Sequence, residues 1–152
     1  MAAADWEPSQ WLMLESWHRA LLEECPVARL ATIMPGGRPR LVPVCFALVE
    51  DRVFIPIDEK PKRSSDLARI RDIRRDARVT FLADRYDDDW TRLAWVRLEG
   101  EARVLSRGSL APDALARLRQ RYAQYATMAL EELPLIEIIP TRIVGWRWSQ
   151  DS

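Results

Sequence analysis

The chain has 152 residues and no formal net charge, because its 23 basic side chains equal its 23 acidic ones. This length allows one domain with a substantial core and is too short for two ordinary ones, so we expect a single domain over residues 1–152. The neutral charge argues against general binding to nucleic acid or to membrane surfaces, and no apolar stretch approaches the ~20 residues that cross a bilayer.

Two further features of the composition predict a cytoplasmic protein. The first residues lack the basic start and the apolar run of a signal peptide. The two cysteines, Cys25 and Cys45, lie in different predicted elements and lack the spacing of metal ligands. We therefore expect reduced, structural thiols.

The first 25 residues predict an N-terminal helix. Apolar side chains recur at helical spacing between residues 8 and 24, and Pro26 ends the pattern. His18, the only histidine, lies in this segment. Because no second histidine or thiolate lies near it in the sequence, we interpret His18 as a polar position on a surface helix rather than as a haem ligand or a general base.

Residues 27–33, 41–49 and 53–57 predict three strands. A Pro-Gly-Gly run separates the first two and a short polar turn separates the next two, so we expect a three-stranded meander. Pro43 lies inside the second strand and cannot donate a ladder hydrogen bond, which indicates an edge, a bulge or a face open to a ligand. Arg38, near the hairpin turn, is a candidate substrate contact.

The stretch that follows the third strand predicts an anion site. Lys60 and Lys62 are the only lysines of the chain, and Arg63 follows them directly. Ser64 and Ser65 then occupy the position of a helix N-cap, before apolar residues at helical spacing. A helix start offers free backbone N–H groups and a partial positive charge, and lysine is a common phosphate ligand. A solvated basic loop is the alternative, but this context favours binding of an anion, in particular phosphate.

Beyond this loop the pattern predicts two helices and four strands. In the strand of residues 92–105 small side chains alternate with larger amphipathic ones, and Gly100 in its middle indicates a bulge or a bend. Three consecutive aspartates at 87–89 indicate a solvated loop rather than a metal site, because carboxylates that repel one another prefer water. The expected elements are a helix from residue 66, strands at 78–83 and 92–105, a helix at 112–126, and strands at 135–139 and 142–148 separated by Pro140.

About seven strands joined mostly by tight turns argue against a doubly wound parallel sheet. A mainly β fold fits better, with an antiparallel barrel over residues 26–148 and helices at its periphery. The sequence contains no glycine-rich dinucleotide loop, no Walker-type phosphate loop and no Gly-x-Ser-x-Gly motif. With a single histidine, the sequence offers no catalytic triad, and we nominate no catalytic acid or base.

Several short motifs follow one another along the chain. They are Ala28-Arg-Leu-Ala-Thr32, Pro43-Val-Cys-Phe46, Lys60-Pro-Lys62, Arg78-Val-Thr-Phe81, Asp89-Trp90 and Trp95-Val-Arg-Leu-Glu-Gly100. Their order and spacing resemble the pyridoxamine 5'-phosphate oxidase-like split-barrel flavoproteins, and within them the branch that binds the deazaflavin coenzyme F420. True pyridoxamine phosphate oxidases carry an Arg-x-x-x-Leu-Lys run, whereas the corresponding strand here is Arg40-Leu-Val-Pro-Val-Cys45. The missing lysine favours the deazaflavin branch over the vitamin oxidase.

The resemblance implies a split β-barrel that forms a homodimer, with two cofactor sites in clefts between the subunits. The residues that it assigns to the cofactor are Lys60, Lys62, Arg63, Ser64 and Ser65 for the phosphate, Pro43, Val44, Ile57 and Asp58 for the ring system, and Trp90 as a cover near the dimer interface. Arg69 and Arg71 would extend the positive charge outward toward the acidic tail of F420.

The implied activity is that of an F420-dependent oxidoreductase that transfers a hydride to or from a small unsaturated or quinone-like substrate. The cofactor supplies the hydride in such enzymes, so the protein has to bind it, orient it and exclude water. Two alternatives stay open. One is an FMN-dependent oxidase or reductase of the same fold, and the other is a non-catalytic protein that binds flavin, deazaflavin or haem.

Overall fold

The structure is a computed structural model, and it describes residues 9–11, 13–57 and 65–149. The strands are β1 (Ser9–Trp11), β2 (Ala28–Ile33), β3 (Pro39–Val44), β4 (Ala47–Val49), β5 (Arg52–Pro56), β6 (Arg78–Arg85), β7 (Ala94–Leu105) and β8 (Leu135–Arg147). The α-helices are α1 (Ser16–Glu24), α2 (Ser65–Arg75) and α3 (Pro112–Arg121), and the 3-10 turns are η2 (Trp90–Arg92), η3 (Gly108–Leu110), η4 (Ala123–Thr127) and η5 (Leu130–Glu132). Among these described helices, none is long and apolar enough to cross a membrane.

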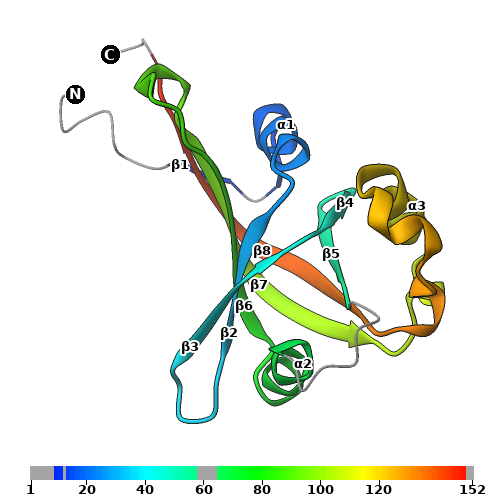
Figure 1. Cartoon of the computed structure of the whole chain (residues 1–152). Helices are drawn as coiled ribbons and strands as arrows, with labels where there is room; N and C mark the ends of the chain where they lie inside the picture. The colour runs from blue at the N-terminus through cyan, green and yellow to red at the C-terminus, as the bar shows by residue number, and fades with distance from the viewer. Residues whose placement is uncertain (1–8, 12, 58–64, 150–152) are drawn as a thin grey trace.

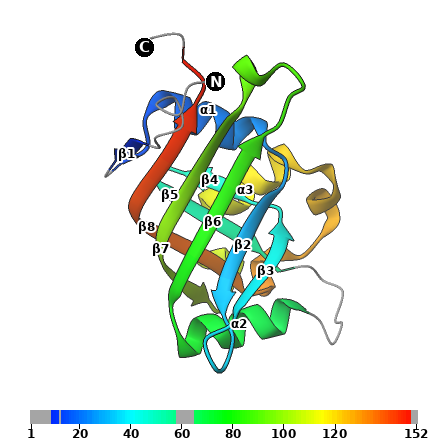
Figure 2. The ribbon, with the colours of Figure 1, turned by 90° about the vertical axis from the view of Figure 1, so that its left-hand side faces the viewer.

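Seven strands form one antiparallel sheet in the order β3-β2-β6-β7-β8-β5-β4, and β1 pairs with β8 beside this path. Five of them, from β8 to β3, lie side by side, and β5 and β4 curl behind them (Figure 2). Helices α1 and α2 lie at opposite ends of the curled sheet, and α3 packs next to β4 (Figure 1). The predicted split barrel with peripheral helices is confirmed.

The core fills the inside of this curl. Its largest fully buried side chains include Phe46 and Phe81, whose rings meet edge to face with centroids 4.9 Å apart. On β7 the expected alternation is confirmed, since Val96 and Leu98 are buried while Arg97 between them is half-exposed. A second, smaller cluster fills the space between α3 and the strands β4, β5 and β8.

The predicted bulge at Gly100 is present in the β7–β8 pairing. Glu99 pairs with Arg142 while Gly100 pairs with Pro140, so β8 contains one extra residue there. A Cβ atom added to Gly100 would lie 2.2 Å from the carbonyl oxygen of Ile139, which explains the glycine. The prediction of two separate strands around Pro140 was wrong, because the bulge lets β8 continue through the proline as a single strand.

The predicted meander of residues 27–57 was wrong in its second strand. Residues 41–49 divide into β3, which pairs with β2, and β4, which pairs with β5, and these two strands lie at opposite ends of the sheet. The chain therefore crosses the barrel at residues 45–46. Helix α3 holds this crossing, because Tyr122 accepts a hydrogen bond from the Phe46 N–H (3.2 Å) and Arg121 donates to the Phe46 carbonyl (3.1 Å).

The N-terminal helix is shorter than expected. Residues 9–11 form β1 instead of a helical turn, and α1 begins at Ser16. The C-terminal helix is also shorter, since α3 ends at Arg121 and a 3-10 turn, η4, follows it.

His18 is fully buried, so its interpretation as a surface residue was wrong. Its Nδ1 accepts a hydrogen bond from the Glu15 N–H (2.9 Å), and its ring centroid lies 4.2 Å from that of Trp17. Burial lowers the pKa of His18, which favours the neutral imidazole that such an acceptor requires. His18 is thus part of the N-terminal cap of α1 and of its packing against β8.

Glu137 joins three strands of the sheet. This buried carboxylate on β8 accepts hydrogen bonds from Arg52 of β5 (2.6 Å) and from Arg103 of β7. Burial raises the pKa of Glu137, but the hydrogen bonds from the two arginines outweigh burial and leave that pKa below its ordinary value. The carboxylate therefore stays charged at neutral pH and stabilises the place where β8 lies between β7 and β5.

Candidate cofactor site

A depression of about 180 Å³ lies between β3, β5 and α2. We call it the Arg69 depression. Its lining residues are Pro43, Val44, Cys45, Ile55, Pro56, Arg69 and Tyr125. Strand β5 ends at Pro56 and α2 begins at Ser65, so the depression lies near both ends of the segment that carries the predicted phosphate loop.

Arg69 gives this depression a buried positive charge. Only 6% of the residue is exposed, because α2 turns it toward β3 and β5 rather than outward. Burial lowers the pKa of Arg69, although a guanidinium keeps its proton in proteins. A planar guanidinium in a sheltered position suits the oxygens of a carboxylate or phosphate. The expectation that Arg69 extends outward was therefore wrong, whereas Arg71 is exposed as expected.

Pro43 and Val44 line the depression together, as the resemblance implies. Strand β3 is an edge of the sheet, which confirms one of the positions predicted for the proline. Pro43 is exposed and Val44 is buried. Ile57 is buried in the main core and is not among the residues that line the depression.

Most of the predicted phosphate ligands lie outside the described residues. These are Lys60, Lys62, Arg63 and Ser64, and their roles stay predictions. Asp58, which the resemblance assigns to the ring system, also lies outside the described residues. Ser65 is the first residue of α2, which agrees with a helix start at this point.

A buried carboxylate fixes α2 beside the depression. Asp72, one turn after Arg69, accepts hydrogen bonds from Thr32 of β2 (2.8 Å), Arg40 of β3 (2.7 Å) and Arg75 (3.2 Å). Burial raises the pKa of this carboxyl, but these hydrogen bonds outweigh burial and leave the pKa below its ordinary value. Asp72 thus ties the helix that carries Arg69 to the β2–β3 hairpin.

Sequence reasoning missed Asp72 and Tyr125 as parts of this region. Asp72 gave a usable signal, because it is the one acidic residue within the basic run Arg69-Ile-Arg-Asp-Ile-Arg-Arg75. For Tyr125 no sequence signal was available. It lies in η4, directly after α3, and lines the depression only once the chain has folded.

Trp90 lies apart from the Arg69 depression. It belongs to η2 and lines a different hollow, at the end of the β6–β7 hairpin. Arg38 is exposed in the turn between β2 and β3 and is not among the lining residues of either cavity. Within one chain, the structure therefore brings together Pro43, Val44 and Arg69, but not Trp90.

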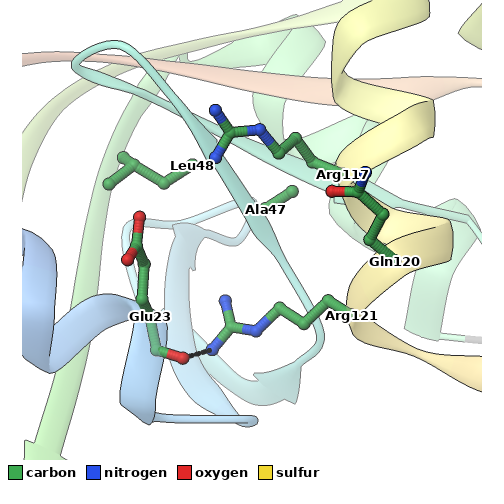
Figure 3. Close-up of a pocket in the computed structure, with 6 residues that line it drawn as sticks. All are labelled: Glu23, Ala47, Leu48, Arg117, Gln120 and Arg121. Atoms are coloured by element: carbon green, nitrogen blue, oxygen red, sulfur yellow. Dashed lines mark hydrogen bonds between the residues drawn. The ribbon is translucent and has the colours of Figure 1, made fainter.

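A third cavity, of about 260 Å³, lies between α1, β4 and α3 (Figure 3). Arg121 lines it and donates hydrogen bonds to the backbone carbonyls of Leu22 (2.9 Å), Glu23 (3.1 Å) and Cys25. Because the guanidinium already donates its hydrogen bonds to these carbonyls, we assign Arg121 to the packing of α3 on the end of α1 rather than to ligand binding.

The described residues offer no metal site of three or more His, Cys, Asp or Glu side chains. Two of the three consecutive aspartates have structural roles instead. Asp87 accepts a hydrogen bond from the Asp89 N–H (2.8 Å), and Asp89 caps η2 through the Thr91 N–H (3.1 Å) and hydroxyl (2.7 Å). Hydrogen bonds from Thr91 lower the pKa of Asp89, so its carboxylate stays charged as a cap.

The curled antiparallel sheet, with a basic depression at the edge strand β3, defines a split-barrel protein. Residues 14–147 match the family model described as pyridoxamine 5'-phosphate oxidase, and the chain belongs to this family. No curated protein matches the chain.

Several solved structures share the fold. A conserved hypothetical protein from Mycobacterium tuberculosis is 22% identical with a TM-score of 0.71, over 89% of this chain and 85% of that one. A FAD-binding protein from Mesorhizobium loti is 19% identical with a TM-score of 0.64, over 91% and 96% of the two chains. HutZ, the heme storage protein from Vibrio cholerae, is 17% identical with a TM-score of 0.62, over 84% and 90%. At these identities the likeness establishes the fold.

Proposed function

We propose that the protein is an oxidoreductase that binds coenzyme F420 and transfers a hydride to or from a small unsaturated or quinone-like molecule. The observation that carries this proposal is the buried guanidinium of Arg69 in a depression beside the helix start that follows the two lysines. A planar guanidinium in a sheltered position suits the oxygens of a phosphate, and a phosphate-bearing cofactor supplies such oxygens. The residues present therefore fit the group.

Each part of the proposed site has a physical role. Lys60, Lys62, Arg63 and the start of α2 bind the phosphate, while Pro43 and Val44 lie along the ring system with Asp58. Pro43 presents no N–H group, and Val44 packs into the same core as Ile57 behind it, so this side of the ring meets an apolar wall. When bound, F420 supplies the hydride, and the chain orients the ring and excludes water.

A second copy of the chain completes the site in this proposal. The Arg69 depression holds about 180 Å³, which is below the ~300 Å³ at the small end of ordinary ligand pockets. One chain therefore encloses only part of a ring system with a phosphate. Trp90 and Trp95, which line a hollow with other aromatic side chains, are the residues that we place near the interface of a homodimer. A stable monomer in sedimentation at micromolar concentration would contradict the homodimer and the shared site.

The decisive experiment is a fluorescence titration of purified protein with F420 and with FMN. In the wild type F420 is expected to bind, and Lys60→Ala or Lys62→Ala should each weaken binding about ten- to a hundredfold, since a hydrogen bond to a charged group contributes roughly 1.5–3 kcal/mol. Arg107→Ala, which removes an exposed charge elsewhere, is the control and should leave the affinity unchanged. If both lysine variants bind as tightly as the wild type, the phosphate site lies elsewhere.

A flavin-binding protein is the second candidate function. The FAD-binding protein from Mesorhizobium loti has the same fold, and FMN shares the ribityl phosphate that the lysines would bind. Haem storage, as named for HutZ, is less favoured here. The only histidine is buried, and its Nδ1 already accepts the Glu15 N–H, so a haem iron would need another axial ligand.

A further inference from the structure

A hollow of about 340 Å³ lies at the end of the β6–β7 hairpin, separate from the Arg69 depression. We call it the aromatic hollow, and its principal lining residues are Asp84, Tyr86, Trp90, Leu93, Trp95 and Trp146. It shares no lining residue with the Arg69 depression. Three indole rings and a phenol around one cavity suit a flat apolar ligand.

The register of the sheet builds the floor of this hollow. Asp84 pairs with Trp95 across β6 and β7, and Trp95 pairs with Trp146 across β7 and β8, so the three side chains form one row on one face. The neighbouring pair, Ala83 and Val96, belongs to the core on the opposite face. Trp146 is only 8% exposed, which provides a fixed apolar surface.

The loop between β6 and β7 forms the rim and is held by its own hydrogen bonds. Arg85 Nε donates to the Arg92 carbonyl (2.7 Å), and the Trp148 N–H donates to the Leu93 carbonyl (3.2 Å). These bonds hold Tyr86 and Trp90, which are 71% and 56% exposed, beside the floor. A rim that is already ordered loses little conformational entropy when a ligand binds.

The charges around the hollow favour a hydrogen-bond donor over an acid. Arg85 is engaged by the Glu24 carboxylate (2.7 Å), so it does not supply an unpaired positive charge. The Asp84 carboxylate oxygen lies 3.4 Å from the Arg29 guanidinium, which is a long ion-pair distance, and both side chains are about half exposed. Asp84 also lines an adjoining hollow with Arg97, whose guanidinium lies 5.5 Å from the centroid of the Trp95 ring. A carboxylate accepts hydrogen bonds and repels a second carboxylate at this position.

We propose that the aromatic hollow binds a flat aromatic molecule that carries an N–H or O–H donor and no acidic group. The ring packs among Trp90, Trp95 and Trp146, and the donor binds Asp84. Within one chain this hollow shares no lining residue with the Arg69 depression. The two proposals meet only at Trp90 and Trp95, which we place near the homodimer interface, and binding in the hollow does not require that F420 be bound.

The test uses the full chain and three matched probes, observed by NMR through the indole N–H resonances of the protein's tryptophans. Indole should shift the resonances of Trp90 and Trp95. 1-Methylindole, which lacks the donor, should bind at least fivefold more weakly, and indole-3-carboxylate should bind more weakly still. Sedimentation of the same samples reports the oligomeric state.

Two variants and one control locate the binding. Trp90→Ala should weaken indole binding at least fivefold, and Asp84→Ala should remove the difference between indole and 1-methylindole. Leu41→Ala, which truncates an exposed apolar side chain on β3, should change neither. Trp90 is half-exposed, so its replacement should leave the melting temperature nearly unchanged.

The proposal fails if millimolar indole shifts none of these resonances, or if the shifts persist unchanged in Trp90→Ala. It also fails if indole does not bind while Trp90→Ala alters the oligomeric state, because the hollow is then a contact between two copies of the chain. Loss of F420 binding in the separate cofactor titration would overturn the proposed function and leave this site standing.

Discussion

Arg69 brings a buried positive charge to the depression that we assign to the cofactor. We predict that Arg69→Met weakens F420 binding about ten- to a hundredfold, because it removes charged hydrogen bonds worth roughly 1.5–3 kcal/mol. Arg69→Lys keeps the charge but loses the planar fork, and should give an intermediate affinity. Fluorescence titration measures both, and circular dichroism of the free protein verifies the fold.

An unchanged dissociation constant in Arg69→Met would remove this residue from the site.

Sequence reasoning could place Arg69 on the right helix but not on the right side of it. The run of arginines on α2 looks solvent-facing, and only the assembled depression, which β5 and η4 also line, reveals that Arg69 is the buried one. His18 illustrates the same limit, since the face that a short helix buries depends on the strand it meets.

Pro43 is a residue whose position could be predicted. A proline cannot donate a ladder hydrogen bond, so the sequence restricted it to an edge, a bulge or an open face. The structure places it on the edge strand β3 and in the lining of the Arg69 depression. A covalent constraint of this kind acts locally, and for that reason it is visible in the sequence.

Helix α2 depends on Asp72 for its attachment to the β2–β3 hairpin. The pKa of this carboxyl is below its ordinary value of 3.8 in the folded protein. Its stabilising contribution is therefore complete above pH about 4 and is lost as the pH falls through the lowered pKa. We predict that Asp72→Asn lowers the free energy of unfolding by roughly 2–3 kcal/mol at neutral pH.

Chemical denaturation of both proteins between pH 7 and pH 2 measures this effect. The difference between wild type and Asp72→Asn should begin to shrink below pH about 4, because the Asp72 carboxyl of the unfolded chain then binds a proton, and it should disappear as the pH falls through the lowered pKa of the folded protein. Asp88→Asn, in the exposed loop after β6, should match the wild type throughout. A difference that stays constant down to pH 2 would mean that the amide disturbs packing rather than charge.

The bulge between β7 and β8 depends on Gly100. A Cβ at this position would lie 2.2 Å from the Ile139 carbonyl oxygen and 2.9 Å from the Pro140 Cα, both backbone atoms. We predict that Gly100→Ala lowers the free energy of unfolding by about 2–4 kcal/mol, since the strands have to separate to admit the methyl group. Thermal unfolding tests this, with Glu101→Ala at the exposed neighbouring position as the control. Equal melting temperatures would show that the bulge can relax.

The strands themselves could be located from apolar alternation and turn residues, but their connections could not. Pro140 looked like the end of a strand because the residue that accommodates it, Gly100, lies some forty positions earlier. The division of residues 41–49 into β3 and β4 could not be predicted either, because it also depends on residues far away in the sequence. Helix α3 holds the crossing through Arg121 and Tyr122, which no local pattern links to Phe46.

At the scale of the whole molecule, the fold class followed from the sequence because a chain of alternating strands and tight turns has few ways to bury its apolar faces.

The choice of cofactor does not follow from the fold. We predict that F420 binds at least tenfold more tightly than FMN at low salt, because its acidic tail adds contacts with the positive charges of Arg63 and of the exposed Arg71.

Salt should reduce this preference, since it screens contacts between exposed charges more than a contact with the buried Arg69. Titrations of both cofactors at two ionic strengths measure the ratio of their dissociation constants. Equal or tighter binding of FMN at low salt would overturn the F420 assignment and leave the split barrel intact.

The position of β8 also has a consequence for synthesis of the chain. Among the strands that the structure describes it is the last to be synthesised, yet it lies between β7 and β5 and provides the hydrogen-bonded path between them. Until residues 135–147 emerge, the nascent protein has two separate pieces of sheet, each with an unpaired strand edge. Such edges pair readily with other chains. A ribosome that stalls before residue 135 therefore releases an aggregation-prone polypeptide.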